Sequence, residues 1–190
     1  VFKEDAGDYP DQFDKKDYGL TQVARVESYR GFIFGSLNPD VLELKDHLGP
    51  SSTFIDMVVD QAADGIEVLK GRSTYIFQGN WKIQAENGVD GYHVYATHGN
   101  YVATTARRRQ LRGEEDQVKA IQVGDMINKR GMGGTFELGH GHCVVFSNLP
   151  NPADRPGFHH YEKFKQQFGG KRAEWMVGRM RNMLLYPNVF

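Results

Sequence analysis

The chain has 190 residues, of which 39% are hydrophobic and 25% charged, and its net charge is −1. This length and composition suit a globular domain with a sizeable core, and the near-zero charge argues against a nucleic-acid or anionic-membrane partner. No apolar run approaches the roughly 18 residues of a membrane span. The single cysteine, Cys143, excludes an internal disulfide and predicts a cytoplasmic protein.

The two ends of the chain predict an internal fragment of a longer polypeptide. The first residue is Val1 rather than methionine, and residues 186–190 read as the start of an apolar strand without a polar tail. Natural termini are usually polar and loosely held.

The first third of the chain predicts irregular and β structure. Polar residues and glycines over 1–20 indicate irregular surface structure. Residues 22–37 are β-branched and aromatic, which predicts a strand with a buried run at 32–34. A turn at Asn38-Pro39 leads to a short helix over 40–48, ended by Gly49-Pro50.

Two further elements precede the central segment. Ser51, Ser52 and Thr53 are candidate N-caps of a short helix. Residues 65–79 alternate in a way that predicts a strand, and Asn80 is placed to cap the following helix.

The second half mixes strands and helices. Residues 99–133 carry a basic cluster at 107–109 and an acidic cluster at 114–116; we expect a solvated helix or loop, with a loop over an active site as the alternative. The remaining predicted elements are strands at about 134–138 and 142–147, a proline-rich loop at 148–156, and helices at 157–168 and 171–185. The absence of regular βαβ alternation predicts an α+β fold with an antiparallel sheet.

The residues that carry chemistry gather in one segment, residues 80–98, which reads NWKIQAENGVDGYHVYATH. Two neighbouring imidazoles, His93 and His98, can bind a first-row metal such as iron or zinc; with one carboxylate they would make the facial triad of non-haem Fe(II) oxygenases. In an ideal helix positions i and i+5 are about 140° apart, so shared binding needs a π-bulge or a break between them. Asp90 lies one turn before His93 on the same face.

A second histidine group, His140-Gly141-His142-Cys143, could indicate zinc. Structural zinc needs four nitrogen or sulfur ligands, usually in two spaced pairs, and no second pair is evident. A turn with one packed histidine and a buried, unreactive Cys143 is the preferred interpretation.

The pattern N-W-K, E-N, D-x-Y-H-x-x-x-x-H resembles the mononuclear-iron motif in the large (alpha) subunits of Rieske-type aromatic-ring-hydroxylating dioxygenases. The segments YRGFIFGSLNPDV, IDMVVDQ, EVLKGRSTY, NPADRP, RAEWM and RN-x-x-LYPN look like the benzoate, toluate and anthranilate 1,2-dioxygenase branch, with 2-halobenzoate enzymes close by. The sequence departs from that branch beside the motif, for example at Gly99, where many members carry tryptophan.

The resemblance implies a helix-grip catalytic domain. Residues 1–40 would be the C-terminal tail of a Rieske [2Fe-2S] domain, and 41–190 a catalytic domain truncated at its C-terminus. It also implies that His93 and His98 bind Fe(II), with an aspartate beyond Phe190 as third ligand. Asp90 would be the electron-transfer bridge between the two metal centres.

The family also implies substrates and partners. Asn87 and Val94 would contact substrate, an aromatic carboxylate that reacts with O2 to give a cis-dihydrodiol. Electrons would come from NADH through a separate flavin/iron–sulfur reductase, and a small (beta) subunit would complete a hetero-oligomer of α3β3 type. The Rieske ligands, two Cys and two His, are not in this chain, so the fragment alone should be inactive.

Three alternatives stay open at this point. The enzyme could be an anthranilate or 2-halobenzoate 1,2-dioxygenase that yields catechol. It could be a non-catalytic helix-grip protein that binds aromatic ligands, since fold does not dictate function. A zinc hydrolase is the third, although no H-E-x-x-H motif is present.

Overall fold

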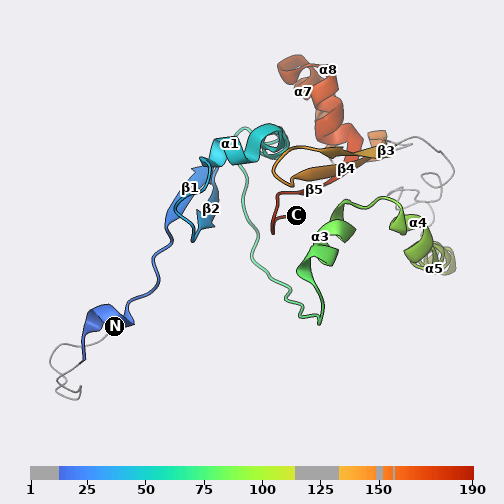
Figure 1. Cartoon of the computed structure of the whole chain (residues 1–190). Coiled ribbons are helices and arrows are strands. Elements are labelled where there is room, and N and C mark those ends of the chain that lie inside the picture. Colours follow the sequence, from blue (N-terminus) through green and yellow to red (C-terminus); the bar gives the residue numbers. More distant parts are fainter. Residues whose placement is uncertain (1–12, 114–132, 149–151, 156) are drawn as a thin grey trace. The chain divides into compact units, whose positions relative to one another are not determined.

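The structure, a computed structural model, describes residues 13–113, 133–148, 152–155 and 157–190 (Figure 1). The chain divides into two compact units, Val1–Leu44 and Lys45–Phe190. No helix in the described ranges is long and apolar enough to cross a membrane.

The first unit holds a 3-10 turn, η1 (Lys15–Tyr18), and an antiparallel hairpin of β1 (Arg25–Tyr29) and β2 (Phe32–Ser36). Arg30 and Gly31 both have positive φ, 52° and 91°, as a two-residue hairpin turn with right-handed strand twist requires. The predicted strand over 22–37 is therefore two strands. The predicted burial of 32–34 is wrong: Ile33 is 77% exposed, because among residues 13–44 of this unit no second layer covers the two-stranded ribbon.

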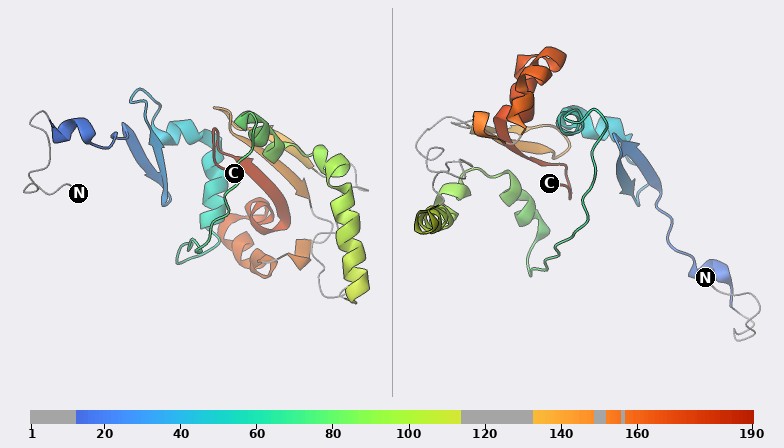
Figure 2. Two further views of the ribbon diagram at one scale, coloured as in Figure 1. Left: turned by 90° about the horizontal axis from the view of Figure 1, so that it is seen from below. Right: turned by 180° about the vertical axis from the view of Figure 1, so that it is seen from behind.

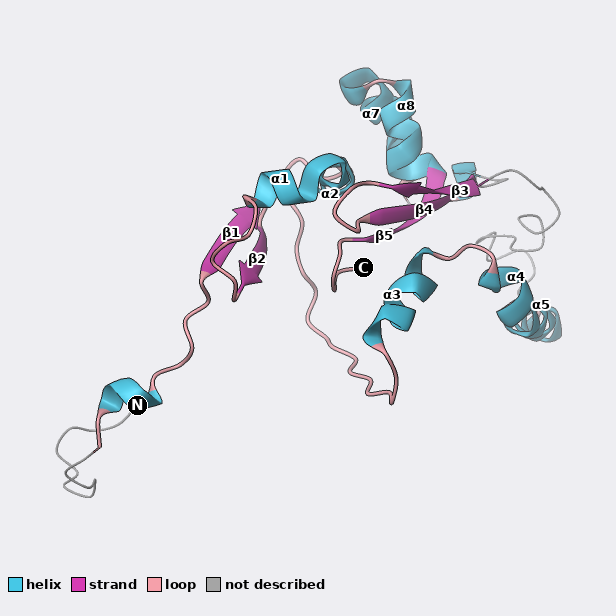
Figure 3. Cartoon of the chain, viewed as in Figure 1, coloured by secondary structure: helices cyan, strands magenta, loops and turns pink. Residues whose placement is uncertain are grey.

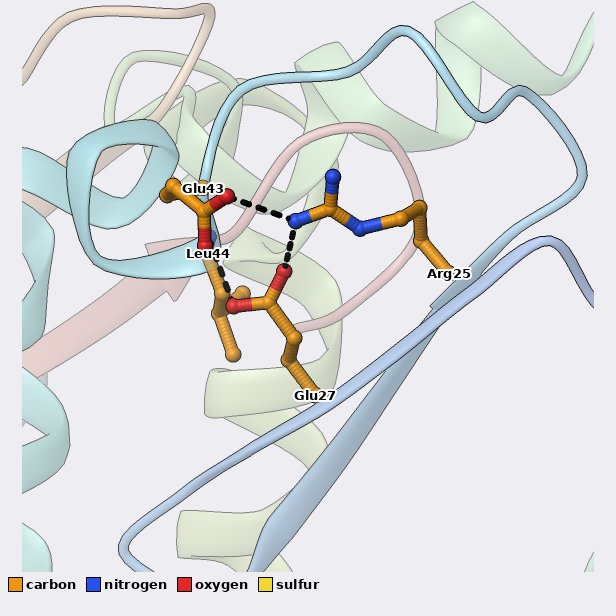
Figure 4. Close-up of polar contacts among 4 residues, drawn as sticks. All are labelled: Arg25, Glu27, Glu43 and Leu44. Atoms are coloured by element: carbon orange, nitrogen blue, oxygen red, sulfur yellow. Dashed lines mark hydrogen bonds and ion pairs between the residues drawn. The ribbon is translucent and has the colours of Figure 1, made fainter.

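Charged side chains connect the hairpin to the end of the first unit (Figure 4). The Arg25 guanidinium donates from Nη2 to Glu27 Oε1 and to Glu43 Oε1, both at 2.8 Å. Glu27 Oε2 accepts from the Leu44 backbone N–H at 3.1 Å. That hydrogen bond, followed by the one from Arg25, lowers the pKa of Glu27. These charged side chains are open to solvent, so their ion pairs contribute little to the stability of the fold. Their main effect is to orient the chain before Leu44.

Short helices follow: α1 (Leu44–Leu48), the 3-10 turn η2 (Gly49–Ser51) and α2 (Ser52–Val59). Of the candidate N-caps, Ser51 occupies the N-cap position of α2, but its side chain makes no capping hydrogen bond. The Ser52 hydroxyl donates backward to the Gly49 carbonyl at 2.6 Å. Because η2 runs directly into α2, the Ser52 N–H has carbonyl partners at Gly49 and Pro50 in the preceding turn.

The second unit is built on a three-stranded antiparallel sheet of order β3-β4-β5 (Figure 3). Its strands are β3 (Gly133–Glu137), β4 (Cys143–Asn148) and β5 (Arg179–Leu184). The first two match the predicted strands closely. A turn with positive φ at Gly139, His140 and Gly141 joins them, and Cys143 pairs with both Glu137 and Leu184.

The predicted helix over 171–185 is half wrong. It begins as α8 (Gly170–Ala173), widens into the π-helical turn η5 (Glu174–Gly178), and then becomes strand β5. The apolar residues of this stretch suit a helical stripe, but strand β4 has an open edge that β5 pairs along its whole length. Tertiary pairing overrides local preference here.

Figure 2 shows the C-terminal helices beside the sheet. Buried apolar side chains from α2 and from these helices form a core cluster. The turns η3 (Pro152–Asp154) and η4 (Phe158–His160) lead into α7 (Tyr161–Phe168), which ends at Gly169 as predicted. The buried core side chains are Met57, Phe164, Ala173, Met176 and Val177. The α+β class with an antiparallel sheet is confirmed.

The predicted strand over 65–79 is wrong. These residues run without regular structure, with Val68 and Ile76 87% and 89% exposed. An extended segment becomes a strand only when a neighbour takes up its backbone hydrogen bonds. No strand pairs with it among the residues that the structure describes.

His142 joins three parts of the second unit and is fully buried. Its Nε2 lies 2.9 Å from the His47 carbonyl oxygen, and its Nδ1 accepts the Tyr186 backbone N–H at 2.9 Å. These partners require a neutral ring protonated at Nε2. With both nitrogens used, the ring has no lone pair for a metal, and the prediction of one packed histidine in a turn is confirmed.

Substitution of His142 should flatten the dependence of stability on pH. Burial lowers the pKa of His142 below its ordinary value of 6.5, so below that pH the unfolded chain binds a proton that the folded chain does not. Folding stability therefore falls as the pH falls through this range. We expect His142→Gln to melt lower than wild type near neutral pH, but with a smaller further drop between about pH 7 and 5.

Melting temperatures followed by circular dichroism would measure this. His159→Gln, at an exposed histidine, is the control and should keep the wild-type slope. An unchanged slope in His142→Gln would contradict the role given to His142.

Candidate metal centre

The predicted metal-binding segment begins with helix α3 (Trp81–Val89). Asn80 caps it as expected, since its Oδ1 accepts from the Lys82 N–H at 3.0 Å. The helix packs against β5, with Ala85 buried. It ends at Asp90, whose backbone is extended.

The helical path is broken twice before the segment ends. A bend at 91–92 precedes α4 (His93–Thr97), and His98, with φ −97° and ψ 3°, separates α4 from α5 (Gly99–Arg112). The predicted irregular helix is confirmed. The break brings the two imidazoles together: the ring centroids of His93 and His98 are 5.2 Å apart, with an angle of 69° between the planes.

This separation suits two ligands of one ion. Imidazoles that bind a metal through nitrogen at about 2 Å have centroids roughly 4.5–5 Å apart when the angle at the metal is near 90–110°. No group of three or more His, Cys, Asp or Glu side chains with metal-binding geometry occurs within the described ranges. His93 and His98 therefore fit a metal as an incomplete ligand set.

Asp90 fixes the orientation of His93. Its Oδ1 accepts the Tyr92 N–H at 2.8 Å, and its Oδ2 lies 3.3 Å from the His93 N and 3.1 Å from the His93 Nδ1. The backbone hydrogen bond from Tyr92 is the main cause that lowers the pKa of Asp90. An ionised Asp90 makes His93 Nδ1 the donor, so the ring lone pair that could bind a metal is on Nε2. Metal-binding histidines are commonly oriented by a carboxylate in this way.

The other predicted residues lie nearby in the chain. Asn87 is exposed on the last turns of α3, and Val94 is half-buried in α4 directly after His93. The arginines 107–109 lie on α5, where Arg107 donates to Gln110 Oε1 at 3.4 Å. The acidic cluster at 114–116 lies outside the described residues.

Sequence reasoning missed the residues of β5 that touch α3. Asn182 donates from Nδ2 to the Gly88 carbonyl at 3.3 Å. Its only signal in the sequence was its place in the RN-x-x-LYPN segment. Helix and strand periodicities relate residues only a few positions apart, so they could not predict this contact between residues 94 positions apart.

Comparison with known proteins places this chain in one class. Residues 64–190 match the family model for the ring hydroxylating alpha subunit (catalytic domain). The chain is 46% identical to the toluate 1,2-dioxygenase subunit alpha of Pseudomonas putida. The matched region covers 96% of this chain and 40% of that protein. It is 44% identical to the anthranilate 1,2-dioxygenase large subunit of Acinetobacter baylyi, covering 97% of this chain and 40% of that protein.

A third relative is the 2-halobenzoate 1,2-dioxygenase large subunit of Burkholderia cepacia, 42% identical over 96% of this chain and 38% of that protein. Among solved structures, a naphthalene 1,2-dioxygenase with bound indole has the same fold. Its TM-score is 0.66 at 23% identity, over 94% of this chain and 40% of that one.

The chain belongs to the ring-hydroxylating alpha subunit family, as its sequence motif predicted. It spans about 40% of the length of the toluate and anthranilate relatives.

Loss of the Asp90 carboxylate should weaken metal binding. Asp90→Ala removes the acceptor that orients His93, and we expect the affinity for Fe(II) to fall by roughly 10–100-fold. Anaerobic competition with a chelator would measure it. Glu162→Ala, at an exposed acid on α7, is the control, and equal affinities in the two variants would contradict the orienting role.

Proposed function

We propose that this chain is part of the large subunit of a terminal oxygenase of the benzoate 1,2-dioxygenase type. The enzyme adds both atoms of O2 to an aromatic carboxylate and gives a cis-dihydrodiol. The observation that carries the proposal is the approach of His93 and His98 across a broken helix, inside a segment that matches the family. The similarity to toluate, 2-halobenzoate and anthranilate 1,2-dioxygenases supports the substrate class.

In this proposal His93 and His98 hold a mononuclear Fe(II), and an aspartate beyond Phe190 is the third ligand. The ion supplies the activation of dioxygen. His93 presents Nε2 because Asp90 holds its Nδ1 proton. Asn87 and Val94 lie beside these ligands in sequence and contact the aromatic ring.

Asp90 also acts as the electron-transfer bridge. It accepts a hydrogen bond from a Rieske-cluster histidine of the neighbouring subunit and so connects the two metal centres. Two features support this assignment: the Asp90 carboxylate is already hydrogen-bonded to His93, and its side chain stays 42% exposed. An ionised, partly open carboxylate has acceptor capacity for one more donor.

The remaining components belong to the larger assembly. Residues 1–40 are the tail of a Rieske domain whose [2Fe-2S] ligands lie outside this chain, and residues 41–190 are part of the catalytic domain. NADH delivers electrons through a separate flavin/iron–sulfur reductase, and a small subunit completes an α3β3 hetero-oligomer in the cytoplasm. The relatives' names, which describe large subunits and large oxygenase components, support a multicomponent enzyme.

An anthranilate or 2-halobenzoate 1,2-dioxygenase is the second candidate. The identities of 44% and 42% to those enzymes are close to the 46% identity to the toluate enzyme, so sequence similarity favours the three substrates almost equally. With anthranilate, the dihydroxylated product loses ammonia and carbon dioxide and becomes catechol.

Removal of either histidine should abolish mononuclear iron binding. In the full-length subunit, His93→Ala and His98→Ala each leave too few protein ligands to retain Fe(II), while the Rieske cluster keeps its own iron. Metal analysis together with the visible spectrum of the cluster would separate the two iron pools. His159→Ala, at an exposed histidine, is the control. Full mononuclear iron in both variants would refute the assignment.

Substrate profiling of the complete enzyme should separate the two candidates. With benzoate, toluates, anthranilate and 2-halobenzoates as alternatives, we expect the highest kcat/KM for benzoate and a cis-dihydrodiol product. Catechol formed preferentially from anthranilate or a 2-halobenzoate would establish the second candidate. Turnover of none of these acids would contradict both.

A further inference from the structure

Helix α3 is supported by a turn that follows strand β5. The Leu185 N–H donates to the Val189 carbonyl at 2.8 Å, and the Val189 N–H donates to the Leu185 carbonyl at 3.1 Å. This bridge reverses the chain after β5, so that its last residues return beside α3 (Figure 1). The turn and the strand before it touch α3 near both of its ends.

At the start of α3, the Trp81 ring meets the Tyr186 ring with centroids 5.8 Å apart. The Tyr186 backbone N–H is held from the other side by the buried His142. The first turn of α3 therefore packs on a residue that the protein core fixes in place.

At the end of α3, two groups converge on Gly88. The Asn182 amide donates to the Gly88 carbonyl at 3.3 Å. The Phe190 ring occupies the space that a side chain at position 88 would take, because a Cβ built there would overlap the ring. Gly88 lies inside a helix and has no positive φ, so its backbone does not require glycine. Glycine is unfavourable within a helix, and the close approach of Phe190 is the physical reason for it here.

We propose that Gly88, Asn182 and Phe190 position the metal ligands, an inference that rests on the proposed function. Gly88 is two residues before Asp90, and Asp90 orients His93. A shift of the Gly88 carbonyl or a tilt of the last turn of α3 therefore moves the Asp90 carboxylate and the His93 ring. The three residues act through Asp90 and do not touch the metal.

The test is a second-site rescue in the full-length subunit. Gly88→Ala should lower Fe(II) affinity by roughly tenfold, because the new methyl group displaces either the Phe190 ring or the helix end. The double variant Gly88→Ala with Phe190→Ala should recover most of the affinity, since it removes the overlapping ring. Gly170→Ala is the matched control, because a Cβ at that helical glycine meets no atom within 4 Å.

Melting of the iron-free protein provides the second readout. Alanine is favoured over glycine in a helix, so the double variant should melt no lower than Phe190→Ala alone. If Gly88→Ala does not fold, Asn182→Asp carries the test. It adds no volume but removes the N–H donor to the Gly88 carbonyl, and it should weaken Fe(II) binding by a factor of several.

Three outcomes would overturn the inference. Gly88→Ala could bind Fe(II) as tightly as wild type, or its defect could persist in the double variant. Where Gly88→Ala does not fold, an Fe(II) affinity in Asn182→Asp equal to that of wild type would overturn the inference. Failure of the proposed function gives a different result, because the wild-type subunit would then contain no mononuclear iron. The inference would be refuted together with the proposed function.

Discussion

The candidate centre depends on one constraint, the five-residue separation of His93 and His98. A continuous helix would direct these side chains about 140° apart. The chain leaves helical geometry at Asp90, bends at 91–92 and breaks again at His98, and the rings approach to 5.2 Å. Asp90 makes the first break stable, because its carboxylate accepts the N–H groups of Tyr92 and His93 that the new helix start exposes. The same carboxylate orients the His93 ring, so backbone capping and ligand orientation come from one side chain.

The sheet holds this broken helix in place from the side. Strand β5 and the turn after it contact α3 through Asn182, Tyr186 and Phe190. The buried His142 secures that turn through the Tyr186 N–H and connects it to the His47 carbonyl. Elements remote in sequence therefore meet beside the segment that carries the candidate ligands. Contacts of this kind orient metal ligands and affect metal affinity in proteins generally.

The segments whose secondary structure was predicted wrongly are those in which it depends on pairing with a segment remote in sequence. Residues 65–79 have a strand-like pattern and no described strand beside them, and they remain irregular. Residues 179–184 have a helix-like stripe, and the open edge of β4 makes them a strand. Backbone hydrogen bonds of a strand are made with another segment, so a local pattern cannot decide them. Helix α7 and its stop at Gly169 needed only local information and were predicted correctly.

For the candidate site, the sequence alone was sufficient to identify the segment 80–98, the family, the cap at Asn80 and the need for a break between His93 and His98. These depend on residue type and spacing along one stretch of chain. Only the tertiary structure decided how the break occurs, that Asp90 holds His93 Nδ1, and that Asn182 and Phe190 meet at Gly88. The physical reason is that hydrogen-bond direction and close packing depend on the relative placement of separate elements, which spacing along the chain does not contain.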